Sequence, residues 1–263
     1  MTEHTPTAVA DPDPDARTAR GTGTGTGTAT GIRPRKRERT RCAIYDAAFR
    51  LFAEQGFDSV TLTRIAAEAD VAPATVFTHF ASKEDIFFSR RQEFIAKLPG
   101  AVADAPAGAE LLAQLRDFYL DSFELVLSDQ WVERSRVFAR ILLPSAALRR
   151  SFLPLLEQRK VLLTEHLVER AGAAGADPVH RQELAIFAAF VVSVGTTAFE
   201  VLHGELAAGE PAARVREDVH DVLDRGFDRL TRAYADGGLL DVCARAAGES
   251  AAPETTAASG TAS

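Results

Sequence analysis

Apolar residues recur at helical spacing along most of this chain. Between Thr40 and Gln55 they fall on one face of a helix, and Gly56 follows at the position where a left-handed C-cap is expected. No segment shows the sustained alternation of Val, Ile and Thr that strands need. The pattern predicts an all-α protein. The apolar face of this first helix comprises Ile44, Ala47, Ala48, Leu51 and Phe52.

Two short apolar stretches follow, from Leu62 to about Ala69 and from Pro73 to His79. Each is too short to hold as a helix in water by itself. Thr61 is placed to cap the first, and Pro73 stands early in the second, where its missing N–H costs little. Braced by the longer helix before them, they form a helix-turn-helix, whose second short helix enters the major groove of DNA. An ordinary helical hairpin gives the same spacing, so the pattern alone leaves both interpretations open.

The remaining chain also reads as helix. A fourth helix is expected to open at Ser82 and to stop before Pro99. Further helices are expected at about 108–128, 131–143, 152–171, 178–204 and 212–235. We therefore expect four parts: a disordered extension with a basic arm at 1–36, a helix-turn-helix domain at 37–98, a second helical domain at 105–236 and a disordered tail at 237–263.

Charge is distributed unevenly along the 263 residues, whose formal net charge is −7. Residues 31–100 carry 12 Lys/Arg against 9 Asp/Glu, a net charge of +3, whereas the residues after 100 carry 16 against 24. Residues 33–41 hold six cations and one anion, Glu38. This asymmetry favours a nucleic-acid-facing end and a body that avoids DNA. For the basic arm alone, a solvated charge run remains the alternative.

Other features narrow the class of protein. We find no secretory signal and no run of roughly 18 uninterrupted apolar residues, so we expect a cytoplasmic protein without a membrane partner. Cys42 and Cys243 are far apart and flank no metal-spaced cluster. Without a nucleophile elbow, phosphate loop or dinucleotide fingerprint, we expect no enzyme, cofactor or metal. A helical interaction module would explain the helices but not the basic stretch beside a helix-turn-helix.

Residues 39–94 resemble the DNA-binding domain of the TetR family of transcriptional regulators. The resemblance implies an N-terminal three-helix domain followed by a helical bundle for effector binding and dimerisation. It also implies a sequence-specific regulator, most simply a repressor that a small-molecule effector releases from a palindromic operator. The matching landmarks are Ala48, Leu51, Phe52, Gly56, Phe57, Thr61, Ile65, Ala66, Ala69, Val71, His79, Phe80, Lys83, Glu84 and Phe87.

The resemblance implies that Thr61 and Lys83 bind backbone phosphate, in agreement with the attraction of anions to helix N-termini and cations. His79 is expected to add a phosphate contact, unless it is capped or merely exposed. Where the family usually has tyrosine, Phe77 lacks the hydroxyl for such a contact. The basic arm is expected to follow the backbone or the minor groove. Its cations are Arg33, Arg35, Lys36, Arg37, Arg39 and Arg41.

The second short helix, PATVFTH, holds none of the Arg, Lys, Asn or Gln side chains that pair with guanine and adenine edges. Base readout is therefore expected from Thr75 and Thr78, and from apolar contact of Ala74 or Phe77 with thymine methyl groups. Arg64, from the preceding helix, is expected to reach a guanine.

Two further sets of residues complete the predicted sites. Apolar faces on the last two helices are expected to pair two subunits, although packing within one subunit is the alternative. Aromatic residues in the second domain suit either a packed core or an effector pocket. The predicted dimer residues are Leu184, Phe187, Val191, Gly195, Phe199, Leu202, Val215, Val222, Gly226 and Leu230. The predicted pocket residues are Phe118, Phe123, Trp131, Phe138, His166 and Phe190.

Overall fold

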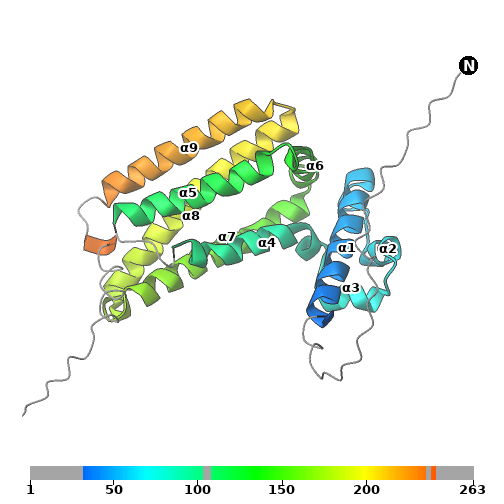
Figure 1. Cartoon of the computed structure of the whole chain (residues 1–263), viewed down its shortest axis with the longest axis horizontal. Coiled ribbons are helices and arrows are strands. Elements are labelled where there is room, and N and C mark those ends of the chain that lie inside the picture. The colour runs from blue at the N-terminus through cyan, green and yellow to red at the C-terminus, as the bar shows by residue number, and fades with distance from the viewer. Residues whose placement is uncertain (1–31, 103–107, 235–237, 241–263) are drawn as a thin grey trace, which may run out of the picture. The chain divides into compact units, whose positions relative to one another are not determined.

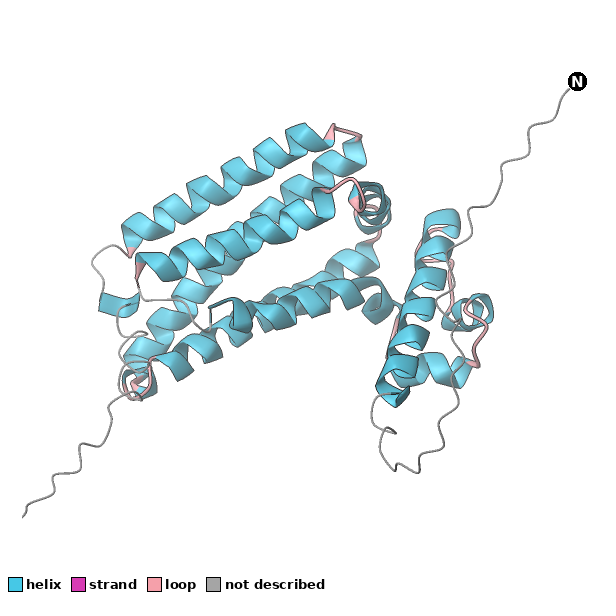
Figure 2. Ribbon diagram, in the orientation of Figure 1, coloured by secondary structure: helices cyan, strands magenta, loops and turns pink. Residues whose placement is uncertain are grey.

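The computed structural model describes residues 32–102, 108–234 and 238–240. All regular structure within these ranges is helical, which confirms the predicted all-α class (Figures 1 and 2). The chain divides into two compact units, residues 1–39 and residues 40–263. The elements in chain order are α1 (Ile32–Gln55), α2 (Leu62–Glu68), α3 (Pro73–His79), α4 (Lys83–Val102), α5 (Ala109–Leu127), α6 (Val132–Leu142), α7 (Ala146–Arg170), the 3-10 turn η1 (Ala174–Ala176), α8 (Pro178–Ala208) and α9 (Ala212–Ala233).

The short helices α2 and α3 are held by buried apolar side chains. Ile65 of α2 and Val76 of α3 have no exposed surface, and neither does Ile44 of α1. Phe52, Phe57 and Phe87 form a cluster of tilted and edge-on rings beneath them. Packing thus supplies the stability that helices of seven residues lack alone.

Helix α8 is the central helix of the second domain. Among the described residues it is the one helix long and apolar enough to cross a membrane by length and composition. In the structure it packs instead against α6, α7 and α9. Gly195 lets α5 approach closely, because a Cβ there would collide with the Tyr119 ring. The apolar character of α8 is therefore explained by its packing against other helices of the same subunit.

Several boundaries differ from those predicted. α1 begins at Ile32 instead of Thr40, and α4 continues three residues past Pro99. α7 begins at Ala146 instead of 152, because the Ser145 side chain accepts a hydrogen bond from the Leu148 N–H and caps it. The interior Pro154 is exposed, so the carbonyl that loses its helical partner can be solvated.

The left-handed C-cap predicted at Gly56 is confirmed, because Gly56 ends α1 with φ +79°. Gly209 ends α8 in the same way, with φ +90°. The Asp177 side chain accepts from the His180 N–H at the start of α8. The extension up to Gly31 and most of the tail, Cys243 included, lie outside the described residues.

Candidate nucleic-acid interface

Helices α2 and α3 are joined by a tight turn that fixes their angle. The Thr61 hydroxyl accepts the Arg64 N–H and caps α2. Asp70 opens the turn with φ +52°, a left-handed conformation that Asp tolerates better than most residues. Pro73 then stands at the first position of α3. These local features set the helix-turn-helix geometry.

One side of α3 faces outward while Val76 holds the other side in the core. Ala74, Thr78 and Phe77 are exposed, and Phe77 shows 60% of its surface. So large an exposed ring is costly in water, and it suits apolar contact with a base edge. The Thr78 hydroxyl donates to the Ala74 carbonyl at 2.9 Å, which leaves its lone pairs as acceptors.

The other residues of this motif that were predicted to contact DNA differ in their exposure. Arg64 is exposed on α2 and makes no ion pair within the described part of the chain. Thr61 is exposed as well, whereas Thr75 and His79 are half-buried. Arg64 is therefore the cation of this motif best placed to reach a base.

The basic stretch lies in the first turns of α1, whose residues 32–36 were predicted to belong to a disordered extension. Arg33 is helical in backbone. Arg35, Lys36, Arg37 and Arg39 are exposed. Successive cations of a helix point to different sides, so fewer of them can meet one DNA backbone than an extended arm would present.

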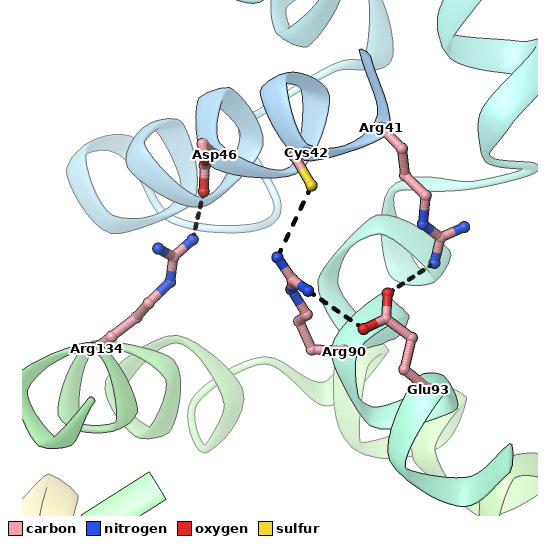
Figure 3. Close-up of polar contacts among 6 residues, drawn as sticks. All are labelled: Arg41, Cys42, Asp46, Arg90, Glu93 and Arg134. Carbon is pink, nitrogen blue, oxygen red and sulfur yellow. Dashed lines mark hydrogen bonds and ion pairs between the residues drawn. The ribbon is translucent and has the colours of Figure 1, made fainter. Parts of the chain in front are cut away.

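Arg41 is engaged within the protein. Its guanidinium pairs with Glu93 of α4, with Nη2 3.5 Å from Oε1 (Figure 3). The same guanidinium stacks 5.0 Å from the centre of the Phe80 ring. Arg90 approaches the other oxygen of the same carboxylate at 3.3 Å. The predicted DNA contact of Arg41 would have to compete with these interactions.

Lys83 has a structural role that corrects its predicted phosphate contact. Its ammonium donates to the carbonyls of Phe57, Asp58 and Val60 at 2.9, 3.3 and 3.4 Å. The same nitrogen lies 4.4 Å from the centre of the Phe57 ring. An ammonium has three N–H donors, so none is left for a phosphate. Lys83 instead ties the start of α4 to the loop between α1 and α2.

The predicted dimer residues pack mainly inside the subunit. Eight of the ten are buried, and Val222 and Gly226 are half-buried. A side chain buried against its own core cannot also cover a partner, so the eight buried residues belong to the core of the single subunit. The outward face of α8 is different: Ile186 and Phe190 are 52% and 51% exposed. Because both faces of α8 carry apolar residues, the sequence pattern could not separate the buried residues from the exposed ones.

The predicted pocket residues do not come together. Phe190 points outward, Phe123 is buried, and Phe138 stacks on Phe87 of α4 at 4.4 Å between ring centres. His166 is half-buried, and burial lowers the pKa of its imidazole. Phe118 stacks on Phe94 at 4.8 Å. Phe118 and Phe123 both lie beside the ring of Tyr119, at 5.8 and 6.5 Å between ring centres.

Sequence analysis did not single out two arginines whose guanidinium atoms are buried in the structure, one on α4 and one on α7. Arg159 of α7 has no exposed surface, and Arg91 of α4 is half-buried with its Nε fully covered. We call Arg91 and Arg159 the two-arginine cluster. Burying a charge costs several kcal/mol, whereas a cation–π contact returns about 0.5–2 kcal/mol. The surrounding rings therefore offset only part of the cost.

A separate cleft of about 530 Å³ lies between the end of α1 and helix α6. Phe52, Gly56 and Phe57 line one side, and Val137 and Arg140 line the other. None of the predicted pocket residues borders it. The aromatic pattern therefore did not locate this cleft.

Comparisons with known proteins agree with the helix-turn-helix. Residues 44–89 match the family described as "Bacterial regulatory proteins, tetR family". The HTH-type transcriptional regulator BetI of Rhizobium meliloti is 39% identical over 70 residues, 26% of this chain and 34% of that protein. The HTH-type transcriptional regulator AcrR of Shigella flexneri is 30% identical over 114 residues, 39% of this chain and 47% of that protein. The chain thus spans about a third to a half of the length of these relatives.

Solved structures with a similar arrangement include a TetR-family transcriptional regulator from Mesorhizobium loti, with 15% identity and a TM-score of 0.44 over 76% of this chain and 98% of that chain. NalD of Pseudomonas aeruginosa has 19% identity and a TM-score of 0.43 over 73% and 97%. The family match covers α1 to α4, and residues 44–89 therefore form a DNA-binding domain of the TetR family type.

Proposed function

We propose that this protein is a sequence-specific transcriptional regulator that binds a palindromic operator as a homodimer. The outward side of α3 carries the proposal, because Ala74, Phe77 and Thr78 are exposed on a helix that Val76 anchors. One helix-turn-helix reads few bases, so two copies are needed for useful specificity. We place the protein in the cytoplasm, with access to chromosomal DNA.

The outward face of α8 is the proposed pairing surface. Ile186 and Phe190 lie one helical turn apart, and Ser193, Thr197 and Val201 continue the same face. Two exposed large apolar side chains next to small residues suit close helix packing between subunits. This proposal keeps the first of the two helices that were predicted to pair, and it names other residues on that helix.

The proposed regulation is repression that ends when a small molecule binds the second domain. A ligand shifts such an equilibrium only if it binds the DNA-free conformation more tightly. α4 begins four residues after α3 ends, and α4 also carries Arg91 of the two-arginine cluster. A movement of α4 in the second domain would therefore act close to the recognition helix.

Selection from randomised duplex DNA tests the DNA-binding proposal. The purified full chain is incubated with the library at about 0.15 M salt, which screens weak nonspecific attraction. We expect an enriched palindrome with two half-sites about one helical turn apart. A Phe77→Ser variant serves as the matched control, because it alters only the exposed face of α3. Failure of both proteins to enrich any sequence would contradict the proposal.

A further inference from the structure

We propose that the two-arginine cluster binds an organic anion, so that the effector of this regulator carries a carboxylate or phosphate group on an apolar body. This inference rests on the proposed effector response and adds the chemical class of the effector. It concerns four helices, α4, α5, α7 and α8 (Figure 1).

The first observation is the unmet hydrogen-bonding capacity of the cluster. Arg159 Nη2 donates to the Tyr119 hydroxyl at 2.5 Å, but its Nε and Nη1 are buried without a partner. Arg91 Nε is likewise buried without one. Guanidinium groups keep their proton in proteins, so these atoms remain charged donors. Donors of this kind fit the oxygen pair of a carboxylate or phosphate.

The second observation is that no carboxylate neutralises the pair among the described residues. The two guanidinium carbons lie 5.6 and 5.7 Å from the centre of the same Phe94 ring. Burial and the charge of Arg159 lower the pKa of Arg91. The nearby His203 adds no further positive charge, because burial lowers the pKa of its imidazole to about 3 and leaves the ring neutral. An anion is what this arrangement lacks.

The walls of the cluster indicate the rest of the ligand. Arg91 lies 4.0 Å from the ring centre of Phe199 and 5.2 Å from that of Phe152. Phe118 stacks on Phe94 beside Tyr119. A free inorganic anion would leave these rings unused, whereas an anion with an apolar or aromatic body would contact them.

Entry of the anion requires a change in packing. Arg159 is fully covered, so the anion-bound conformation must differ from this one. Half-buried Arg91 is the side chain that an incoming anion meets first. Its neighbours on α4, Arg90 and Glu93, contact Cys42 and Arg41 of α1 (Figure 3). An anion that draws Arg91 toward Arg159 would therefore act on the contacts between α4 and α1.

The test compares matched anionic and neutral probes with the full-length protein in the absence of DNA. 2-Naphthoate and 2-naphthyl phosphate are each compared with neutral 2-naphthamide, and inorganic phosphate is added at the same ionic strength. The readouts are the shift in Tm and the heat of binding. We expect one or both naphthyl anions to raise Tm by several degrees, and the amide and inorganic phosphate to raise it little. Comparing the Tm shifts with 2-naphthoate and 2-naphthyl phosphate shows whether the site prefers a carboxylate or a phosphate.

Two variants separate binding from structure. Arg91→Met removes a charge that has no hydrogen-bond partner among the described residues, so the ligand-free Tm should stay the same or rise while the anion-induced shift is lost. Arg159→Met combined with Tyr119→Phe removes both partners of the buried Arg159–Tyr119 hydrogen bond. Like Arg91→Met, this double variant should lose the anion-induced shift while its ligand-free Tm stays the same or rises. Arg150→Met, an exposed arginine on the same helix α7, should keep the full shift.

Two results would overturn the inference. One is an equal Tm shift with the anions and the neutral amide in the wild-type protein. The other is a large loss of ligand-free stability in Arg91→Met, which would assign the arginine a structural role. Because these readouts need no DNA, they stand apart from failure of the operator selection. Release of the selected operator by the binding anion, absent in Arg91→Met, would link the site to regulation.

Discussion

Arg134 Nη2 of α6 donates to Asp46 Oδ1 of α1 at 2.6 Å (Figure 3). The same guanidinium lies 5.0 Å from the ring centres of both Tyr45 and Phe49. One side chain of the second domain thus holds both a carboxylate and two rings of the first helix. The ion pair is about half exposed, whereas Tyr45 and Phe49 are buried. Ring stacking should therefore outweigh the ion pair in stability.

Replacing the two partners should separate these contributions. Asp46→Asn should lower the free energy of unfolding by less than about 1 kcal/mol, as for an exposed ion pair. Arg134→Ala should cost about 1–2 kcal/mol, because stacking and side-chain packing are lost as well. Urea denaturation measures both. Equal costs for the two variants would show that the ion pair dominates.

Lys83→Met tests the structural role of the ammonium. Three carbonyls of the loop between α1 and α2 lose their donor, and we expect a loss of about 1–3 kcal/mol in the free energy of unfolding. The exposed Lys97, on the same helix, provides the matched variant Lys97→Met, which should cost little.

The salt dependence of DNA binding gives a second readout for Lys83. The slope of log K against log salt should stay unchanged in Lys83→Met, since this ammonium is already occupied. In Arg37→Ala the slope should decrease by about 1 if that exposed cation meets a phosphate. A reduced slope in Lys83→Met would instead support the phosphate contact that the resemblance implied for Lys83.

Arg64→Ala should relax base preference at one position in each half-site. A guanine contact contributes about 1–3 kcal/mol of discrimination, and no other side chain of α2 or α3 offers a bidentate donor. The comparison variant is Arg50→Ala, because Arg50 is also exposed but pairs with Glu68 at 3.3 Å. Unchanged preference for Arg64→Ala in the randomised selection would remove Arg64 from base readout.

Asp70 should report on the geometry of the turn. At φ +52° a glycine is free of strain, so Asp70→Gly should keep or slightly raise stability. Asp70→Val should lose about 1–2 kcal/mol, because a β-branched residue is strained in this region. Thermal unfolding compares the two. Similar Tm values for Gly and Val would indicate that the turn relaxes to another conformation.

The outward face of α8 should control subunit association. Phe190→Glu and Ile186→Glu should turn a dimer into a folded monomer, because both side chains are about half exposed in the single subunit. Phe187→Glu should instead unfold the domain, since that side chain has no exposed surface. Sedimentation velocity and circular dichroism distinguish these outcomes. A dimer that survives both exposed-site variants would place the pairing surface elsewhere.

Local chemistry explains what could be predicted. The limits of α3, the cap at Thr61 and the left-handed Gly56 depend on neighbours within a few residues, so the sequence alone indicates them. The family landmarks lie in the same stretch. Pro99 misled the prediction of α4, because three further helical residues follow it.

What the sequence by itself determined is the all-helical class, the helix-turn-helix and the family, because hydrophobic period, caps and motif spacing are local properties. Only the tertiary structure decided which apolar face of α8 points inward, since Phe187 is buried and Phe190 is half exposed although both are phenylalanines on the same helix. It also decided that Lys83 serves the fold and that Arg91 and Arg159 share one buried cluster. Burial and pairing depend on residues distant in sequence, and no local pattern carries that information.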